Sequence, residues 1–207
     1  SMDPQGLSDF KKEFQVSFDL NHTNLLHANY LGTTAEDNRA YLVMPLCPDG
    51  SATKYIGKAD EFVLWKFIKD VAGGLAYLHD QHPPLIHQDI KPDNILISKN
   101  GDFLITDFGI SKQLKSSMRK SAHLNSAGAV EYMGPERFSK QYHAVKASDI
   151  WSLGVTIYEL IMDDLPFCGM GGSMQKQGAD IPDLPEEFSD KMKIIFESCM
   201  AKETWDR

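Results

Sequence analysis

Cysteine is scarce in this chain: three of its 207 residues are cysteines. Cys47, Cys168 and Cys199 are odd in number and widely spaced, and no two of them have the spacing of a metal-binding pair. This pattern argues against a disulfide framework and against a cysteine metal site. It predicts reduced thiols in a cytoplasmic protein, and we recognise no secretory leader in the sequence.

Long apolar runs and an excess of positive charge are also absent. The most apolar stretch, residues 151–162, is shorter than a membrane span and contains Glu159, so we expect no membrane partner. The chain has 21 Lys and Arg against 29 Asp and Glu, a net charge of −8. Because nucleic acids bind basic faces, this balance argues against nucleic acid as a partner. A hydrophobic content of 42% predicts one ordinary globular core for a chain of this length.

The most informative segment is residues 87–94, which read His-Gln-Asp-Ile-Lys-Pro-Asp-Asn and are followed by Asp-Phe-Gly at 107–109. Two strand-like stretches, 95–98 and 103–106, flank an Asn-Gly turn between these motifs. The pattern predicts a β-hairpin that carries both motifs on rigid elements. Together the motifs supply carboxylates, a lysine and an amide at a spacing suited to a nucleoside triphosphate and its Mg²⁺.

These residue types fit phosphoryl transfer, which depends on positioning and charge neutralisation more than on covalent chemistry. We expect Asp89 to orient or accept the proton of the attacking hydroxyl, and Lys91 to bring positive charge to the transferring phosphoryl group. Asn94 and Asp107 offer the hard oxygen ligands that Mg²⁺ prefers. A role for Asp89 and Asn94 as turn caps alone does not explain the whole run.

Apolar periodicity and turn residues organise the rest of the chain. The expected elements are helices at 10–21, 61–82, 147–162 and 192–199, a strand pair at 25–31 and 41–46, and loops at 112–127 and 168–186, the last with one short helical turn.

In this order, the segments resemble a eukaryotic-type Ser/Thr protein kinase from about Ser8 to Arg207. The resemblance implies an α+β, protein kinase-like fold with a mainly helical C-lobe and an incomplete N-lobe of one helix and a strand pair. It assigns residues 1–44 to the N-lobe, 45–50 to the hinge, and 51–207 to a C-lobe truncated before its last helix. It also implies ATP and Mg²⁺ as cofactors and a protein as substrate.

By the same resemblance, the nucleotide-binding residues are Met44, Pro45, Cys47, Leu96, Thr106 and Glu13. Met44 would be the gatekeeper, and the backbone of Pro45 and Cys47 would meet the adenine. Leu96 would lie under the ring. Glu13 falls on the helix glutamate that pairs with the family's nucleotide-binding lysine.

Structural positions of the family are matched as well. Gly-Pro-Glu at 134–136 resembles the family's Ala-Pro-Glu, and Arg207 falls where a conserved Arg pairs with Glu136. Asp149 begins a buried helix, and in the family this residue bonds the catalytic-loop backbone, which offsets the cost of burying a carboxylate. Lys91 favours Ser and Thr substrates over Tyr.

The sequence also departs from the family. No Gly-rich loop and no Val-Ala-Ile-Lys strand precede Glu13, so the cover of the nucleotide site and its lysine are expected to be missing. Gln88 replaces the Arg that would dock a phosphorylated activation loop, whose candidate sites are serines at 116–126. Ala129 stands where a threonine hydroxyl would support Asp89 and Lys91.

Ser17 and Ala28 stand where larger apolar residues would pack on Phe108, which predicts a loosely held helix around Glu13. The apolar face left uncovered by the missing strands predicts self-association.

Three functions are compatible with these observations. The first is a Ser/Thr protein kinase domain, with weak or no activity in these 207 residues alone. The second is a pseudokinase or truncated kinase fold that acts as a scaffold, which the missing lysine favours and intact Asp89, Asn94 and Asp107 oppose. The third is a small-molecule phosphotransferase, which Gly-Pro-Glu and the serine-rich segment before it oppose.

Overall fold

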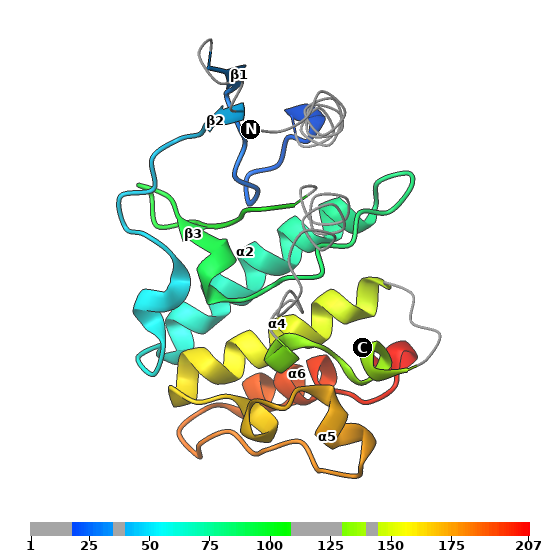
Figure 1. The fold of residues 1–207 in the computed structure, drawn as a ribbon. Helices are drawn as coiled ribbons and strands as arrows, with labels where there is room; N and C mark the ends of the chain where they lie inside the picture. Colours follow the sequence, from blue (N-terminus) through cyan, green and yellow to red (C-terminus); the bar gives the residue numbers. More distant parts are fainter. Residues whose placement is uncertain (1–17, 35–39, 109–129, 140–144) are drawn as a thin grey trace.

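The computed structural model describes residues 18–34, 40–108, 130–139 and 145–207. Its strands are β1 Tyr30–Thr33, β2 Ala40–Val43, β3 Ile95–Ile97 and β4 Phe103–Ile105, and its helices are α2 Glu61–His79, α4 Lys146–Met162, α5 Gly172–Lys176 and α6 Asp190–Cys199. Short 3₁₀ turns join them: η1 Ala52–Tyr55, η2 Pro92–Asn94, η3 Val130–Tyr132, η4 Pro135–Phe138, η5 Pro166–Gly169 and η6 Thr204–Asp206. The β1–β2 pair lies at one end of the molecule and α5 at the other (Figure 1).

Helix α2 begins where Asp60 accepts a hydrogen bond from the Val63 amide (2.8 Å), one of the amides that a helix start leaves unpaired. Its buried apolar residues form one stripe, namely Leu64, Phe67, Val71, Leu75 and Leu78. Gly74 lies on the same face, where a Cβ would come within 2.8 Å of the Ile105 side chain. The glycine therefore lets β4 pack directly against α2.

Helix α4 crosses the middle of the molecule between α2 and α6 and forms the centre of the core (Figure 1). Its side chains are buried on nearly all sides, which explains the apolar composition of residues 151–160. The buried Trp151 indole donates to Gln175 Oε1 (3.2 Å), and the Gln175 amide donates to the Met200 carbonyl (2.7 Å). The helix ends at Asp163, which takes a left-handed φ of +52°.

The strands form two separate antiparallel pairs. Tyr30 pairs with Val43 in the first, and Ile95 pairs with Ile105 in the second. The second pair is the predicted hairpin, and Gly101 in its turn has a φ of +82°, which glycine adopts without strain. The helices predicted at 147–162 and 192–199 are confirmed as α4 and α6, and the short helical turn within 168–186 is α5.

The first predicted strand was placed too early. Residues Leu25 and Leu26 are buried because they lie beside β4, where the Leu26 amide donates to the Ile105 carbonyl (2.8 Å). Strand β1 starts only at Tyr30, and β2 ends at Val43 rather than at Leu46, whose side chain is 86% exposed.

Two predicted helix ends also differ. Helix α2 ends at His79 rather than at residue 82, because the Leu78 carbonyl bonds the Leu85 amide (3.0 Å) and the chain turns back there. The first helix ends at Asp19 rather than near Asn21. Its start, the loop at 112–127, and the predictions for Glu13, Ser17 and Ala129 lie outside the described residues. Within the described part of the chain, no helix is both long enough and apolar enough to cross a membrane.

Candidate active site

Asp149 on α4 fixes the start of the loop at residues 87–94. Its carboxylate is fully buried and accepts hydrogen bonds from the backbone amides of His87 (2.8 Å) and Gln88 (2.7 Å). The His79 ring, at the end of α2, lies 2.8 Å from the same carboxylate. Gln88 has a φ of +66°, a conformation that a non-glycine residue keeps only when its surroundings hold it. The expected bond between Asp149 and the loop backbone is therefore confirmed.

The buried His87 ring joins this loop to the end of β4. Its Nδ1 accepts from the Asp89 amide (3.3 Å), and its Nε2 lies 2.7 Å from the Thr106 carbonyl oxygen. With Nδ1 accepting, Nε2 carries the proton and donates to that carbonyl. The Thr106 amide in turn donates to the Asn94 carbonyl (2.9 Å). These bonds place the loop beside Asp107, which follows Thr106 in the chain.

Asn94 orients the carboxylate of Asp89. Its side-chain amide donates to the Asp89 carbonyl oxygen (2.7 Å) and to Asp89 Oδ2 (3.1 Å). Lys91 Nζ lies 3.7 Å from Asp89 Oδ1, so both carboxylate oxygens face a partner. The side chains of Lys91 and Asp89 keep 25% and 16% of their surface exposed, which leaves them reachable from solvent. Sequence reasoning grouped these three residues, and the structure brings them together.

The residues proposed as Mg²⁺ ligands fit that ion in their chemistry. Because the Asn94 amide nitrogen faces Asp89, its Oδ1 is the atom left to act as a ligand. Asp107 is exposed and has a φ of +61°, a strained conformation of the kind found at functional sites. Mg²⁺ commonly uses one or two protein oxygens together with substrate phosphates. Among the described residues, no three His, Cys, Asp or Glu side chains form a metal-binding cluster.

The predicted hinge meets the hairpin at Leu96. The Gly50 amide donates to the Cys47 carbonyl (3.1 Å), and the Gly50 carbonyl accepts from the Ile97 amide (2.9 Å). Ser51 and Leu96 form a single β-bridge. The candidate hinge residue Cys47 and the candidate floor residue Leu96 are therefore joined through one short backbone connection, and both side chains are half-buried.

The other residues predicted to bind the nucleotide differ in how far they are exposed to solvent. Met44 keeps 43% of its surface and Pro45 is also exposed. Burial raises the pKa of the Cys47 thiol, so that group stays protonated at neutral pH. Glu13 lies outside the described residues.

Tyr132 and Glu159 form a half-buried pair behind the Gly-Pro-Glu segment. The Tyr132 hydroxyl donates to the Glu159 carboxylate. Burial, and then this hydrogen bond, raises the pKa of Tyr132. Burial also raises the pKa of Glu159, and the nearby Asp93 and Asp163 add to that rise, although the Tyr132 bond opposes it.

The predicted Arg207–Glu136 ion pair is confirmed, with Nη2 and Oε2 separated by 3.0 Å. The Arg207 side chain has no exposed surface, and its guanidinium also donates to the carbonyls of Ala201 (2.6 Å) and Lys202 (2.8 Å). Burial lowers the pKa of Arg207, while Glu136 opposes that shift. This pair ties the Gly-Pro-Glu segment to the C-terminal end of the described chain.

Sequence reasoning missed residues that reach the site from far along the chain. His79 belongs to no motif recognised in the sequence, yet its ring lies 2.8 Å from the carboxylate of Asp149, 70 positions away. Asp70 accepts a hydrogen bond from the backbone of Phe103 (3.0 Å), and Asn24 donates to the carbonyl of that same residue (3.2 Å). None of these residues belongs to a motif that would have marked it as part of the site.

Comparison with known proteins agrees with this geometry. The model of the protein kinase domain matches residues 2–207. An Aurora kinase from Schizosaccharomyces pombe is 33% identical over 165 residues, which cover 78% of this chain and 44% of that protein. A probable serine/threonine-protein kinase from Dictyostelium discoideum is 32% identical over 206 residues, which cover 97% of this chain and 31% of that protein.

A mitogen-activated protein kinase kinase kinase 1b from Physcomitrium patens is 31% identical over 204 residues, covering 95% of this chain and 25% of that protein. The chain thus spans less than half the length of these relatives. The family match covers nearly the whole sequence and includes every element that holds the residues described above. This chain is a member of the protein kinase family, with the α+β fold of that family.

Proposed function

We propose that this domain transfers the γ-phosphoryl group of ATP to serine or threonine hydroxyls of proteins. The observation that supports this most directly is the convergence of Asp89, Asn94 and Asp107 at the open end of the β3–β4 hairpin. Asn94 bonds the Asp89 carboxylate (3.1 Å), and its carbonyl accepts from Thr106, the residue before Asp107 (2.9 Å). These are the groups that phosphoryl transfer needs side by side.

Asp89 orients the hydroxyl that attacks and receives its proton. Its carboxylate is held by Asn94 and faces Lys91, so it is fixed before the substrate arrives. Lys91 carries positive charge to the transferring phosphoryl group. Asn94 Oδ1 and the Asp107 carboxylate hold Mg²⁺, which supplies charge neutralisation to the phosphates when it is bound.

The base and sugar of the nucleotide lie between the hinge and the hairpin. The backbone of Pro45 and Cys47 meets the adenine, Met44 limits the depth of the site, and Leu96 forms its floor. Support comes from the bond between Gly50 and Ile97 (2.9 Å), which keeps hinge and floor adjacent. Of the two other residues assigned by the family resemblance, Thr106 directly follows β4. Glu13 is the position whose counterpart in the family pairs with a nucleotide-binding lysine.

The 207 residues by themselves are expected to transfer phosphate slowly. Their sequence contains no Gly-rich loop and no Val-Ala-Ile-Lys strand before Glu13. A glycine-rich cover and a lysine stabilise the charge of the phosphates in a site that excludes water, and removing one such group costs roughly a hundred- to a thousandfold in rate. Activity should therefore be measured on the complete protein.

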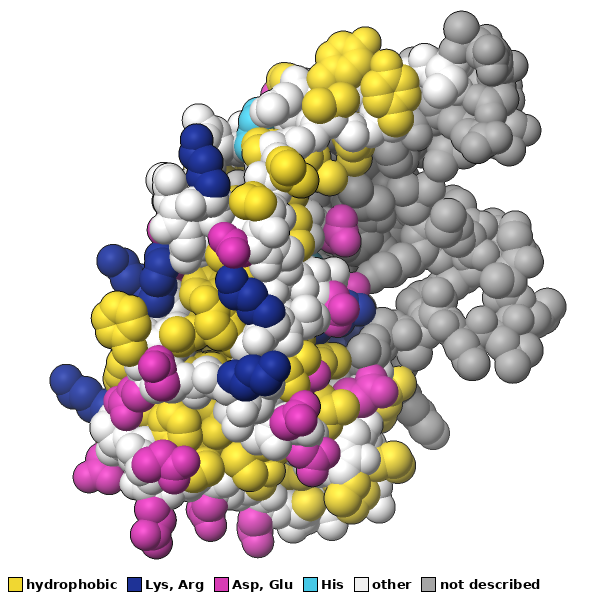
Figure 2. Space-filling model, turned by 90° about the vertical axis from the view of Figure 1, so that its left-hand side faces the viewer, with side chains coloured by type: hydrophobic (Ala, Val, Ile, Leu, Met, Phe, Trp, Pro, Cys, Tyr) yellow, Lys and Arg dark blue, Asp and Glu magenta, His cyan; other side chains and the backbone are white. Residues whose placement is uncertain are grey.

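A protein substrate, a cytoplasmic location and the absence of nucleic-acid binding are parts of this proposal. So is self-association through the β1–β2 pair. Its side chains Tyr30, Tyr41 and Val43 keep 55%, 43% and 45% of their surface exposed, and apolar groups gather at that end of the molecule (Figure 2). Aromatic and aliphatic groups gathered in this way favour burial against a partner.

The test is Mg²⁺-dependent phosphorylation by the full-length protein of a panel of peptides and of small alcohols. Asp89→Asn should lower turnover by about a hundredfold or more, the loss typical of a positioned base. Asp107→Asn should instead raise the Mg²⁺ concentration needed for half-maximal rate. Phosphorylation of small alcohols but not of peptides would replace the proposal with a small-molecule phosphotransferase. No transfer to either class, with the fold intact, would favour a scaffold.

A further inference from the structure

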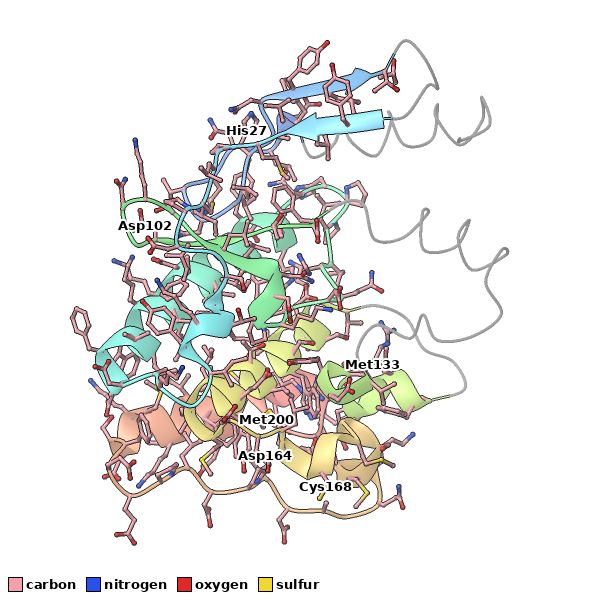
Figure 3. The ribbon with its side chains drawn as sticks, turned by 60° about the vertical axis from the view of Figure 1, so that its left-hand side comes forward. His27, Asp102, Met133, Asp164, Cys168 and Met200 are labelled. Atoms are coloured by element: carbon pink, nitrogen blue, oxygen red, sulfur yellow. The ribbon has the colours of Figure 1, made fainter. Side chains whose placement is uncertain are left out.

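Lys66 of α2 lies between two carboxylates that belong to different elements. Its Nζ is 2.8 Å from Asp70 Oδ2, one turn along the same helix, and 2.8 Å from Asp102 Oδ1. Asp102 lies at the turn of the β3–β4 hairpin (Figure 3). The Lys66 and Asp70 side chains keep 35% and 10% of their surface, so this pair is partly withdrawn from water. Burial lowers the pKa of Lys66, but its hydrogen bonds to Asp102 and Asp70 outweigh that effect and raise it.

Asp70 binds the backbone of β4 as well as Lys66. Its Oδ2, the oxygen that faces Lys66, also accepts a hydrogen bond from the amide of Phe103 (3.0 Å). This bond connects the first residue of β4 to α2. The carbonyl of Phe103 accepts from the Asn24 side chain (3.2 Å) on the other side. One residue of β4, Phe103, is therefore bonded through its backbone both to α2 and to the N-terminal segment.

The N-terminal segment follows β4 further along its length. The Ile105 amide donates to the Asn24 carbonyl (2.9 Å), and the Leu26 amide donates to the Ile105 carbonyl (2.8 Å). That segment continues into β1 and β2, which lead to the hinge. Residues 24–26, which lead to the hinge, are therefore held against β4, the strand that leads away from the catalytic loop and its hairpin.

The same strand also leads to the metal ligands. Thr106 and Asp107 follow β4 directly, and Asn94 directly precedes β3, so both ligands lie at the open end of the hairpin, away from the turn that Lys66 holds. The two strands are joined in one antiparallel register, with Ile97 opposite Phe103 and Ile95 opposite Ile105. If the turn of the hairpin moves, we therefore expect Asn94 and Asp107 at its other end to move as well.

We propose that Lys66 is a positioning residue for the metal–nucleotide complex: by joining Asp70 to Asp102, it fixes the β3–β4 hairpin between α2 and residues 24–26. The inference rests on the proposed kinase function. An exposed ion pair alone contributes little, because salt and water screen it. Here the lysine also neutralises a carboxylate that holds strand backbone, so without it Asp70 and Asp102 repel each other and the Phe103 bond is disturbed.

The experiment compares Lys66→Met, Lys66→Arg and Lys69→Met with the wild type in the full-length protein. Methionine keeps the length and apolar stem of the side chain and removes its charge, whereas arginine keeps the charge. Lys69 is exposed on the same helix, so Lys69→Met is a control for the same charge change. The measurements are the affinity for Mg·ADP by calorimetry, the KM for Mg·ATP, kcat, and the thermal midpoint of unfolding.

We expect Lys66→Met to weaken Mg·ADP binding and to raise the KM for Mg·ATP by about three- to tenfold, with a smaller change in kcat. Lys66→Arg should stay within about twofold of the wild type, and so should Lys69→Met. A lower unfolding midpoint with unchanged nucleotide affinity would overturn the proposal and leave Lys66 a purely stabilising role. Asp102→Asn removes only the ion pair between Lys66 and the hairpin turn and leaves the Lys66–Asp70 pair on α2 in place. It therefore tests the link between α2 and the hairpin where Lys66→Met does not fold.

The outcome for the wild type separates this inference from the proposed function. A wild type that neither binds Mg·ADP nor transfers phosphate would remove the proposed function, and the inference with it. A wild type that is active, beside a Lys66→Met protein with unchanged nucleotide affinity, would remove the inference alone.

Discussion

Gln88 and Asp149 are joined by a 2.7 Å hydrogen bond from a backbone amide to a fully buried carboxylate. Gln88 has a φ of +66°, so the bond holds the loop in a conformation that costs of order 1–3 kcal/mol for a non-glycine residue. Because Asp89 is the next residue, the carboxylate of Asp149 determines where the candidate catalytic carboxylate lies. The central helix α4 therefore supports both the core and the active site.

Asp149→Asn should destabilise the fold by about 2–4 kcal/mol. Both oxygens of Asp149 accept hydrogen bonds, from the His87 and Gln88 amides and from His79, whereas asparagine has one acceptor oxygen and a nitrogen that can only donate. The measurement is urea unfolding followed by fluorescence. Ser148→Ala is the matched control, since Ser148 Oγ is buried without a hydrogen-bond partner among the described residues. Because this hydroxyl is buried and unpaired, we expect the control to be at least as stable as the wild type. Equal stability of Asp149→Asn and the wild type would contradict this account.

Phosphorylation of the serines at 116–126 should change activity little through residue 88. Gln88 carries no charge, and a phosphate finds no guanidinium on that residue for a bidentate pair. The Gln88 side chain instead faces Arg137, whose Nη1 lies 3.5 Å from Gln88 Oε1. The measurement is kinase activity of the full-length protein before and after phosphatase treatment, with the loop sites mapped.

Two variants make that comparison decisive. Gln88→Arg should make activity sensitive to phosphatase, because it supplies the guanidinium that in the family docks a phosphorylated activation loop. A large loss of activity in the wild type that persists in Gln88→Arg and disappears in Arg137→Ala would show that Arg137 binds the phosphate instead. A large loss that depends on Gln88 itself would refute the prediction.

Cys168 and Cys199 should differ in reactivity toward a thiol reagent at pH 8. Cys168 is exposed and should react within minutes. Cys199 is 7% exposed, and burial raises its pKa to about 11, so it should react only when the protein unfolds. Mass spectrometry of the labelled peptides, with and without urea, measures both rates. Rapid labelling of Cys199 in the folded protein would show that the contact between α4 and α6 is not closed.

The catalytic motifs and the long helices could be predicted from sequence because their signals are local. The order of residues 87–94 places Asp89, Lys91 and Asn94 on one loop, whatever the rest of the chain does. Helix α2 combines an apolar period with Asp60 as N-cap, and both signals lie within a few residues of the helix. The contact of Asp149 with the loop backbone and the ion pair of Arg207 with Glu136 were foreseen only through the family resemblance, since each joins residues more than 60 positions apart.

The first strand and the polar supports of the hairpin could not be predicted in this way. Leu25 and Leu26 are as apolar as a strand requires, but they are buried by β4, which is far away in sequence. The Lys66 pair with Asp70 fits ordinary helix spacing, and nothing in the sequence points to its third member, Asp102. Long-range burial and polar contacts of this kind are decided by packing, which local patterns do not report.

The pair of Tyr132 and Glu159 leads to a prediction about pH. Burial raises the pKa of Glu159, so the folded state binds its proton more tightly than the unfolded state does. Stability contributed by this group should therefore fall as pH rises from the unfolded pKa, about 4.3, through the folded value. Glu159→Gln removes the titration, so its stability relative to the wild type should improve between pH 4.5 and pH 7.5, by urea unfolding.

The change with pH is the test, because the absolute stability of Glu159→Gln also reflects the replacement of the acceptor for the Tyr132 hydroxyl. Glu197→Gln, at an exposed position on α6, is the control and should show no such trend. Tyr132→Phe should make the wild-type trend steeper, since the Tyr132 bond lowers the pKa of Glu159 and its removal allows a further rise. A Glu159→Gln protein whose stability runs parallel to the wild type across this range would mean that Glu159 is solvated and does not titrate abnormally.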